Sequence, residues 1–314
     1  MCTFGVIRAI LLRASLIDPI LPLMSSENDL FPERPSLTRM DLYLGDCVAG
    51  LTQIPKQFVD LVVTSPPYNL GIKYSNYDDR RTPEEYLIWS CKWASAVKRV
   101  LKDDGALFLN VAGSPSQPYM PHELVLALRD IFTLQNTLHW IKSISVKTPD
   151  DQHLSVGHFK PINSKRYLTN CHEYLFHLTK TGNNTLDRLA LGVPYTHKSN
   201  IARWGHTEGK DKRCRGNNWF VPYKTIMSRK GERPHPATFP IELAENCIKL
   251  HGTEPSQTTM LDPFLGIGHA AEAAKQQNLA RFIGFEIDEE YLSVACERLG
   301  TTAIKPDTPS TKEN

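Results

Sequence analysis

The sequence has no two cysteines in a C-x-x-C arrangement. Its seven cysteines stand singly at positions 2, 47, 91, 171, 214, 247 and 296. Structural zinc sites are usually built from such pairs, so we expect no metal site. The odd number and wide spacing indicate reduced thiols rather than a disulfide framework. No apolar run is long enough to span a bilayer, so we expect no membrane partner.

A charge excess of one sign is also missing. The 314 residues include 36 Lys or Arg and 34 Asp or Glu, which gives a formal net charge of +2. The total charge therefore does not indicate nucleic acid, and any basic surface must come from a local cluster. A chain of this length with 41% hydrophobic residues fits one large α/β domain, or such a domain with an insertion.

The two ends of the chain differ from its middle. Residues 1–24 are apolar and carry two arginines before the first acid, Asp18. They are compatible with a targeting peptide, an extension from an early start codon or a short packed helix. Residues 25–39 have the composition of a linker. We expect a flexible extension or leader over 1–39, a folded domain over 40–300 and a disordered tail over 301–314.

Apolar strand patterns alternate with amphipathic helix patterns along the domain, which predicts an α/β fold with a mostly parallel, doubly wound sheet. Thr82 followed by Pro83 marks one helix start. Residues 181–233 break the alternation and are predicted to be an inserted irregular region. Strands are predicted over 40–46, 58–65, 106–112, 137–145, 173–180, 258–264 and 281–287, and helices over 82–101, 122–131, 240–251, 269–278 and 289–299.

A glycine turn, LDPFLGIG at 261–268, joins a predicted strand to a predicted helix. Gly266 and Gly268 allow a tight turn and the close approach of a ligand. Glu286 lies at the tip of the next strand, where an acid can accept hydrogen bonds from both ribose hydroxyls. The third glycine of the dinucleotide fingerprint and the G-K-[ST] of a P-loop are missing. S-adenosylmethionine, which has no phosphate, therefore fits better than a nucleotide diphosphate; the alternative is a turn with an incidental surface Glu.

A second stretch, VVTSPPYN at 62–69, ends a predicted buried strand with a hydroxyl, two prolines and an aromatic ring. The prolines lack N–H donors and fix φ, so the turn is rigid. Taken alone, it could be a proline-rich loop that merely ends the strand.

Together, TSPPYN at 64–69 and LDPFLGIG at 261–268 resemble the amino-group DNA methyltransferases, and their order resembles the β group of that family. The resemblance covers roughly residues 40–299. It implies a seven-stranded, Rossmann-like methyltransferase fold with circularly permuted motif order. It also implies S-adenosylmethionine as cofactor, double-stranded DNA as partner, a catalytic domain over 40–300 and a target-recognition region over 181–233. Restriction-modification enzymes occur in this family, and homodimers are common in it.

The resemblance extends to single residues. YLGDC at 43–47 is similar to the family's opening strand, and its Asp46 would reach the adenine amine of the cofactor. HPATFP at 235–240 is similar to the segment that lines the methionine end. His269 departs from the family, which often has Thr there. The implied cofactor-binding residues are Asp46, Asp262, Phe264, Gly266, Gly268, Glu286, His235 and Pro236.

The chemistry of such a site can be argued from the residues. An exocyclic amine is a poor nucleophile because its lone pair is delocalised into the ring. Acceptors placed on its protons pull the nitrogen toward sp³ geometry. Ser65 Oγ and the carbonyl of Pro66 are suitable acceptors, and Pro67 helps to hold that carbonyl in place. Tyr68 can stack on a base extracted from the duplex.

The target base follows from two observations. Methylation at cytosine carbon 5 uses a Cys nucleophile next to a Pro in that enzyme class, and none of the seven cysteines follows a Pro. Within the resembling family, the tetrapeptide that corresponds to SPPY at 65–68 begins mostly with Ser in cytosine N4 enzymes and mostly with Asp in adenine N6 enzymes. Ser65 therefore favours cytosine N4. The alternatives are an adenine N6 enzyme, a methyltransferase for RNA or protein, and a DNA-binding module without catalysis.

A local basic cluster lies between positions 198 and 233, with ten Lys or Arg and three Asp or Glu, a balance of +7. Such a cluster can neutralise phosphates, and Trp204, Trp219 and Tyr223 within it could stack on bases. The alternative is a solvated loop with core aromatics. The predicted DNA-binding residues are Lys198, Arg203, Lys210, Lys212, Arg213, Arg215, Arg229 and Lys230.

We expect the protein in the bacterial cytoplasm at the nucleoid, or in the nucleus if eukaryotic, with organelle targeting by residues 1–24 as an alternative.

Overall fold

The computed structural model describes residues 38–69, 80–148, 150–157, 163–203, 207–222 and 238–304. The strands are β1 Arg39–Leu44, β2 Val59–Thr64, β3 Leu101–Val111, β4 Thr133–Ile141, β5 Ser143–Lys147, β6 His153–Gly157, β7 His172–Thr179, β8 Asn218–Phe220, β9 Thr259–Asp262 and β10 Arg281–Glu286. The helices are α1 Cys47–Leu51, α2 Pro83–Val100, α3 Met120–Ala127, α4 Ser199–Arg203, α6 Ile241–His251, α7 His269–Gln276 and α8 Glu289–Leu299, with short 3-10 helices η2 Leu128–Asp130 and η4 Pro255–Gln257.

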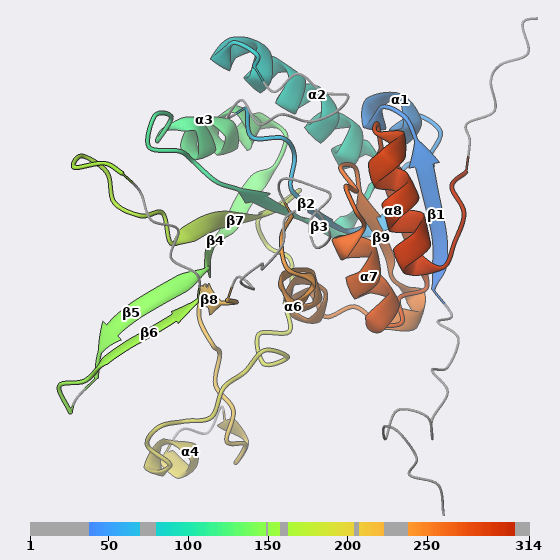
Figure 1. Ribbon diagram of the computed structural model, residues 1–314. Helices are drawn as coiled ribbons and strands as arrows, with labels where there is room; N and C mark the ends of the chain where they lie inside the picture. Colours follow the sequence, from blue (N-terminus) through green and yellow to red (C-terminus); the bar gives the residue numbers. More distant parts are fainter. Residues whose placement is uncertain are drawn as a thin grey trace, which may run out of the picture. The chain divides into compact units, whose positions relative to one another are not determined.

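Eight of the strands form one sheet in the order β1-β10-β9-β2-β3-β7-β4-β8 (Figure 1). Neighbours are parallel from β1 to β3, and β8 is parallel to β4. Strand β7 runs antiparallel to both β3 and β4. The predicted mostly parallel α/β sheet is confirmed. It has eight strands rather than seven because Asn218–Phe220, within the region predicted to be irregular, adds β8 to one edge.

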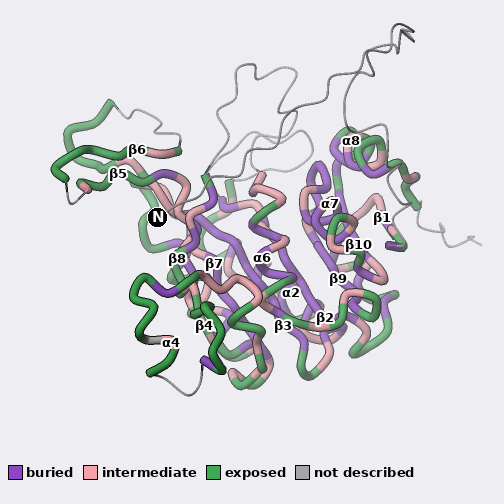
Figure 2. The backbone as a smooth tube through the Cα atoms, turned by 90° about the horizontal axis from the view of Figure 1, so that it is seen from below, coloured by how far each residue is buried: buried purple, intermediate pink, exposed green. Residues whose placement is uncertain are grey.

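Helices cover both faces of this sheet, so it has two hydrophobic cores. Strand β2 shows the pattern: Leu61 and Val63 pack with α6, α7 and α8, whereas Val62 packs with α1, α2 and α3. All six residues of β2 are buried, as expected for a central parallel strand with helices on both sides (Figure 2). The doubly wound layering follows from this alternation.

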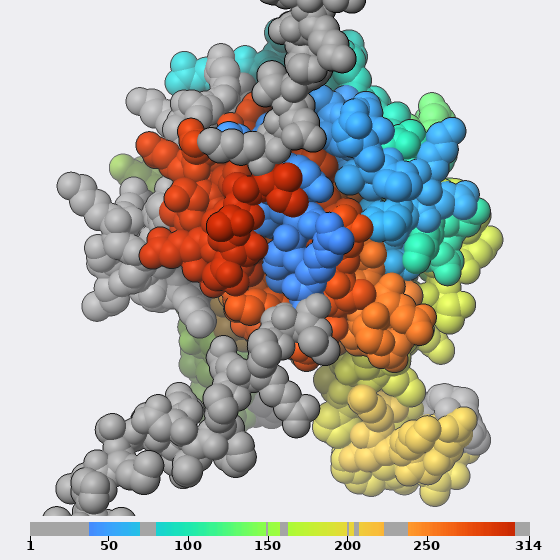
Figure 3. All heavy atoms as spheres, turned by 90° about the vertical axis from the view of Figure 1, so that its right-hand side faces the viewer, coloured from blue at the N-terminus to red at the C-terminus, as the bar shows by residue number. Residues whose placement is uncertain are grey.

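The first strand of the described chain lies among its last elements. β1 pairs with β10, and Tyr43 forms a further bridge with Ile304. Figure 3 shows the blue β1 region beside the red C-terminal helix α8. This arrangement lets the loop after β1 and the loops after β9 and β10 share one edge of the sheet.

Helices α2 and α8 both begin with a side-chain cap, and the cap by Thr82 was predicted from the sequence. Thr82 caps α2: its Oγ1 accepts from the Glu85 amide at 3.3 Å, and Glu85 accepts from the Thr82 amide at 3.0 Å. Asp288 caps α8 by accepting from the amides of Glu290 and Tyr291. Each such cap is worth about 1 kcal/mol.

Two predicted boundaries were wrong. The residues Asp103–Gly105, expected as a break before a strand at 106, lie within β3, where the pairing with β2 jumps from Val59↔Leu101 to Leu61↔Ala106. The strand predicted over 137–145 is split between β4 and β5, because after Ile141 the chain leaves the sheet and forms the β5–β6 hairpin.

The buried His177 on β7 predicts a pH dependence of stability. Its ring stacks on Phe108 with the centroids 4.6 Å apart, and Nδ1 is hydrogen-bonded to Asn136. Burial, and then the nearby His251, lowers the pKa of His177 to about 4. The folded chain therefore holds the ring neutral where the unfolded chain protonates it. We expect this residue to lower the free energy of unfolding by about 2 kcal/mol between pH 7 and pH 5.

Urea unfolding at both pH values checks this expectation, with His177→Gln as the comparison because an amide does not titrate. The variant should lose about 2 kcal/mol less than the wild type over this interval. An equal loss in both proteins would contradict the assignment.

Candidate active site at the carboxyl ends of β2 and β9

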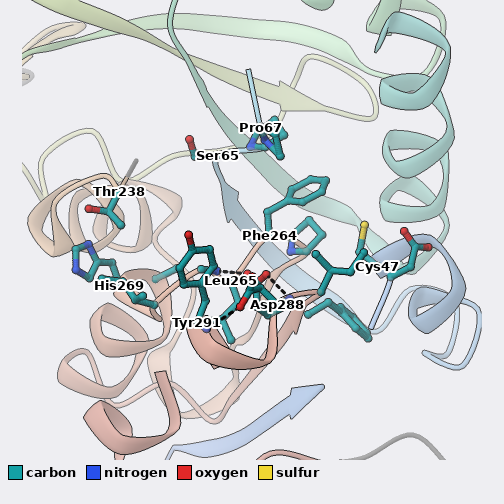
Figure 4. A pocket seen from close by; sticks show the side chains of 18 of the residues that line it. Cys47, Ser65, Pro67, Thr238, Phe264, Leu265, His269, Asp288 and Tyr291 are labelled. Atoms are coloured by element: carbon teal, nitrogen blue, oxygen red, sulfur yellow. Dashed lines mark hydrogen bonds between the residues drawn. The ribbon is translucent and has the colours of Figure 1, made fainter. Parts of the chain in front are cut away.

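A pocket opens where the loops after β2 and β9 meet. The two strands are parallel neighbours, with Leu61 paired to Met260 and Val62 paired to Leu261, so their loops leave the same edge of the sheet. The pocket has about 1110 Å³ of empty space, including its opening to solvent. That is large enough for a nucleoside and a second planar group. Ser65 and Pro67 line one side, Asp288 and Tyr291 the other, with Phe264 between them (Figure 4).

The SPPY loop is held from two directions. Tyr86 on α2 donates a hydrogen bond to the carbonyl of Pro67 at 2.9 Å. Asn69 adopts a left-handed backbone with φ of 57° and exchanges two hydrogen bonds of 2.8 Å with the backbone of Arg81. Both contacts fix the loop without using Ser65 or Pro66, which face the pocket.

Tyr68 is buried, and its hydroxyl joins a network inside the protein. Ser65 Oγ lies 2.6 Å from the phenol oxygen, Asn110 Nδ2 donates to it at 2.7 Å, and the phenol donates to Glu173 Oε2 at 3.1 Å. Asn110 Nδ2 also donates to Glu173 Oε2 at 2.7 Å. Lys142 pairs with the other carboxylate oxygen at 3.1 Å. Sequence reasoning missed Asn110, Lys142 and Glu173, because no local motif contains them.

Glu286 and Gly266 belong to one unit of the glycine loop. Gly266 has φ of 55°, and its amide donates to Glu286 Oε2 at 2.7 Å. The amide of Asp288 donates to Glu286 Oε1 at 2.9 Å. Burial raises the pKa of Glu286, while these two amides oppose the shift. The described residues include no salt bridge to Glu286, so its remaining lone pairs suit neutral hydroxyl donors.

Asp262 and Gly268 do not line the pocket, although both were predicted to bind the cofactor. Asp262 is buried, and its Oδ1 accepts from Thr64 Oγ1 at 2.6 Å and from the Phe264 amide at 2.9 Å. Burial raises the pKa of Asp262 to about 7. Gly268, with φ of 84°, lies so close to Ala295 that a Cβ would approach it within 3.1 Å. Both residues therefore shape the loop from behind.

Asp46 and Phe264 do line the pocket. Asp46 caps α1 by accepting from the Ala49 amide at 3.0 Å through Oδ1, which leaves its second oxygen for a ligand. The ring of Phe264 is fixed by Trp89 and Trp93, with both centroid distances 5.5 Å. A flat aromatic wall beside an exposed carboxylate suits an adenine ring with its amine.

Two further pocket residues lie next to predicted ones in the sequence: Cys47 follows Asp46, and His269 follows Gly268. Cys47 lines the pocket, but burial, followed by the charge of Asp46, raises the pKa of its thiol to about 12, so it is not a ready nucleophile. His269 also lines it, with Nδ1 hydrogen-bonded to the Phe239 carbonyl at 2.6 Å. Of the HPATFP segment, the predicted His235 and Pro236 lie outside the described residues. Two other residues of that segment, Thr238 and Phe239, line the pocket. The lining residues outside the predicted motifs are Arg81, Trp89, Ala270, Phe285, Ile287, Asp288 and Tyr291.

The basic segment is only partly described, since Arg229 and Lys230 lie outside the described ranges. Two of its cations have acidic partners: Lys198 pairs with Asp211, and Lys210 pairs with Glu208 at 2.9 Å. These exposed pairs are weak and can be exchanged for phosphate. Within the described ranges, no salt bridge involves Arg203, Lys212, Arg213 or Arg215.

Trp219 does not fit the stacking role predicted for it. It lies on β8, is buried, and donates from Nε1 to the Gly216 carbonyl at 3.1 Å. It therefore belongs to the hydrophobic core. Trp204 and Tyr223 lie outside the described residues.

Metal-binding clusters and membrane-spanning helices are both absent from the described part of the chain. That part holds no group of three or more His, Cys, Asp or Glu side chains placed to bind a metal ion. None of its helices has the length and apolar character needed to cross a membrane.

The fold and the pocket match known proteins. A protein-family model described as DNA methylase, of the N6/N4 methyltransferase type, matches residues 59–297, a range that contains both pocket loops. The chain belongs to this family of DNA methylases. Among its relatives is the type II methyltransferase M.ScaI of Streptomyces caespitosus, 30% identical over 272 residues that cover 83% of the methylase and 82% of the relative. Another is the DNA adenine methyltransferase YhdJ of Escherichia coli K12, 26% identical over 263 residues that cover 81% of each chain.

Two solved structures share the fold. The PvuII DNA methyltransferase, described as cytosine-N4-specific, has a TM-score of 0.59 and 21% identity, with 85% of the methylase and 89% of that chain covered. TTHA0409 of Thermus thermophilus, in complex with S-adenosyl-L-methionine, has a TM-score of 0.54 and 23% identity, with 83% and 93% covered. The methylase is therefore an S-adenosylmethionine-dependent DNA methyltransferase of the N4-cytosine and N6-adenine family, and the predictions of family, fold and cofactor are confirmed.

Proposed function

We propose that the methylase transfers a methyl group to the exocyclic N4 amine of cytosine in double-stranded DNA, on a base turned out of the duplex. One observation carries the proposal: Ser65, Pro66 and Tyr68 line the same pocket as Gly266 and Glu286. A flipped base and an adenosyl group can therefore share one enclosed space. Holding two reactants in that geometry is a large part of what a transferase must do.

The chain's own residues fit S-adenosylmethionine at the glycine-loop side of the pocket. Glu286 would accept from the ribose hydroxyls, Asp46 from the adenine amine, and Phe264 would contact the adenine face. Asp262 and Gly268 would support this wall from behind. The cofactor, when bound, supplies a methyl group on a sulfonium sulfur that keeps the C–S electron pair as the methyl leaves.

On the opposite side, Ser65 and Pro66 would accept hydrogen bonds from the amine of the flipped base, and the ring of Tyr68 would contact its face. Tyr86 fixes the Pro67 carbonyl, and Pro67 cannot donate a hydrogen bond, so the Pro66 carbonyl is held in place. A fixed acceptor loses no entropy when the amine arrives, which favours the reactive geometry.

Ser65 supports cytosine over adenine, since the family mostly pairs Ser at this position with cytosine N4. Adenine N6 is the second candidate, because the relative YhdJ is described as a DNA adenine methyltransferase. The PvuII enzyme, described as cytosine-N4-specific, shares the fold. Transfer of a labelled methyl group from S-adenosylmethionine to DNA, RNA and protein substrates tests the substrate class. Label in DNA only is expected, and label in RNA or protein alone would overturn the proposal.

We further propose that the basic segment binds DNA phosphates. Replacing Arg203 and Arg213 together by Ala should weaken DNA binding across all sequences. It should also reduce the slope of log K against log salt by about 1 for each phosphate that the variant no longer neutralises. Affinity for S-adenosylmethionine should not change. Fluorescence anisotropy of a labelled duplex at several salt concentrations measures the DNA affinity and its salt dependence.

Lys56→Ala is the matched control for this experiment, because Lys56 is an exposed cation next to the amino end of β2, opposite the pocket edge. It should leave the salt dependence unchanged. If the double variant behaves like this control, these two arginines do not contact the phosphates.

A further inference from the structure

The network behind Tyr68 has a fixed hydrogen-bond direction. Asn110 Nδ2 can only donate, and a carboxylate can only accept. The phenol oxygen therefore accepts a hydrogen bond from Asn110, and its single O–H donates to Glu173. Because the phenol has no second proton, Ser65 must be the donor in its 2.6 Å contact with Tyr68. The hydroxyl proton of Ser65 is thus engaged inside the protein, and what Ser65 offers to the pocket is its lone pairs.

The carboxylate of Glu173 sets the direction of the hydrogen bonds made by Asn110, Tyr68 and Ser65. Asn110 is buried, and its Oδ1 has no hydrogen-bond partner among the described residues. Turning the amide over would give Oδ1 the position 2.7 Å from Glu173 Oε2, where two oxygen acceptors repel. Glu173 therefore orients both the amide and the phenol. Lys142, at 3.1 Å, balances the charge of this largely buried carboxylate.

We propose that Glu173 makes Ser65 an acceptor for the exocyclic amine of the target base and, through Tyr68 and Ser65, takes up the proton that this amine loses. The inference rests on the proposed function, because it needs a base amine at Ser65. It gives a serine the acceptor character that a carboxylate would have at the same position.

Protons and charges balance when the proton passes along the hydrogen bonds from the amine through Ser65 and Tyr68 to Glu173. The amine nitrogen uses its lone pair to form the new N–C bond and becomes positively charged with two hydrogens. One of these passes to Ser65 Oγ, the proton of Ser65 passes to the Tyr68 oxygen, and the proton of Tyr68 passes to Glu173 Oε2. A neutral methylated amine and a protonated Glu173 remain, and release of that proton to solvent restores the site. The transfer runs downhill because a positively charged ring amine of this kind is a stronger acid than a carboxylic acid.

Glu173→Gln tests the role of the carboxylate. The amide oxygen of the new Gln would stay with Lys142, so its NH₂ group would donate to Tyr68. Tyr68 would then donate to Ser65, and the Ser65 proton would turn toward the amine of the base. The single-turnover rate of methyl transfer at saturating S-adenosylmethionine and DNA should fall about 100-fold or more. Affinity for S-adenosylmethionine, measured by calorimetry, should stay within about threefold, because Glu173 does not line the pocket.

The double variant Asn110→Asp with Glu173→Gln supplies the rescue. It exchanges the amide and the carboxylate on either side of Tyr68 and keeps size and net charge. Tyr68 can then donate to the new carboxylate on β3, and Ser65 again donates to Tyr68. The rate should recover at least about tenfold over Glu173→Gln alone. A residue with a purely structural role would not show this recovery from moving the charge.

A second readout needs no cofactor. It uses duplex oligonucleotides that carry the mapped methylation site with either the normal target base or its carbonyl analogue, uracil for cytosine or hypoxanthine for adenine. If Ser65 only accepts, the wild type should bind the base with the amine more tightly than its carbonyl analogue. In Glu173→Gln the hydrogen bonds run in the opposite direction, so Ser65 can donate to the carbonyl and the analogue should bind better. We expect the ratio of the two affinities to fall about tenfold in Glu173→Gln and to return in the double variant.

The outcomes separate this inference from the proposed function. If the wild-type protein methylates no DNA base, the proposed function itself is wrong. A wild-type protein that methylates DNA while Glu173→Gln keeps its rate within about threefold overturns the role of Glu173. So does a double variant that is no better than the single one. An unchanged affinity ratio in Glu173→Gln would show that the carboxylate does not set the direction of the hydrogen bonds from Ser65 to Tyr68.

Discussion

Replacing Ser65 by Ala should lower the rate of methyl transfer about 10²- to 10³-fold while S-adenosylmethionine binds as before, within about threefold. The substitution removes the acceptor that pulls the amine toward reactive geometry and cuts the connection to Tyr68 and Glu173. The backbone of the loop should survive, because Tyr86 and Asn69 hold it independently of the Ser65 side chain. Single-turnover kinetics at saturating cofactor and DNA measure the rate, and calorimetry measures the affinity.

Ser145→Ala serves as the matched control, since Ser145 is an exposed serine of the β5–β6 hairpin that pairs with Ser155. It should leave both quantities unchanged. If Ser65→Ala instead lost cofactor affinity as strongly as rate, the SPPY loop would be a structural support and not the acceptor for the amine.

Replacing Glu286 by Gln should weaken S-adenosylmethionine binding by about 100-fold or more. Both carboxylate oxygens already accept from backbone amides, those of Gly266 and Asp288. A Gln must therefore turn its NH₂ group toward one of these donors. The variant loses an acceptor for ribose and also disturbs the turn that shapes the pocket.

This variant should bind DNA nearly as well as the wild type, because the basic segment is not touched. Glu290→Gln is the control and should bind the cofactor normally, because Glu290 is exposed in the first turn of helix α8, four residues after Glu286. Equal cofactor affinity in Glu286→Gln and the wild type would remove Glu286 from the cofactor site.

The sequence was most informative where the residues of the site lie within a few positions of one another. The SPPY loop and the glycine loop each carry their residues within a few positions, and the strand patterns before them are apolar. The sheet then brings them together, since β2 and β9 are parallel neighbours and Thr64 bonds to Asp262 across 198 positions. Because each motif follows a strand and the two strands are parallel neighbours, both loops leave the sheet at the same edge.

The network behind the loop could not be found in this way. Asn110 and Glu173 meet because β3 pairs antiparallel with β7, which sets Asn110 opposite Leu175. Lys142 follows β4, whose residue Trp140 lies opposite Glu173. These partners are set by pairing across the sheet, and a single sequence gives no signal for that register.

Local composition also misled in one place. Trp219 stands among basic residues and was predicted to stack on bases, but it is buried in the core on β8. A three-residue edge strand is too short to show a period of two, so its burial could not be recognised.

The central claim is that the SPPY loop directs methyl transfer to the amine of a DNA base. Mass spectrometry of nucleosides from the DNA of cells that express the wild-type chain or Ser65→Ala tests it most directly. We expect N4-methylcytosine with the wild type and its loss with the variant. N6-methyladenine instead would change the target base and leave the chemistry in place. No methylated cytosine or adenine from the wild type, or equal levels from both chains, would contradict the claim.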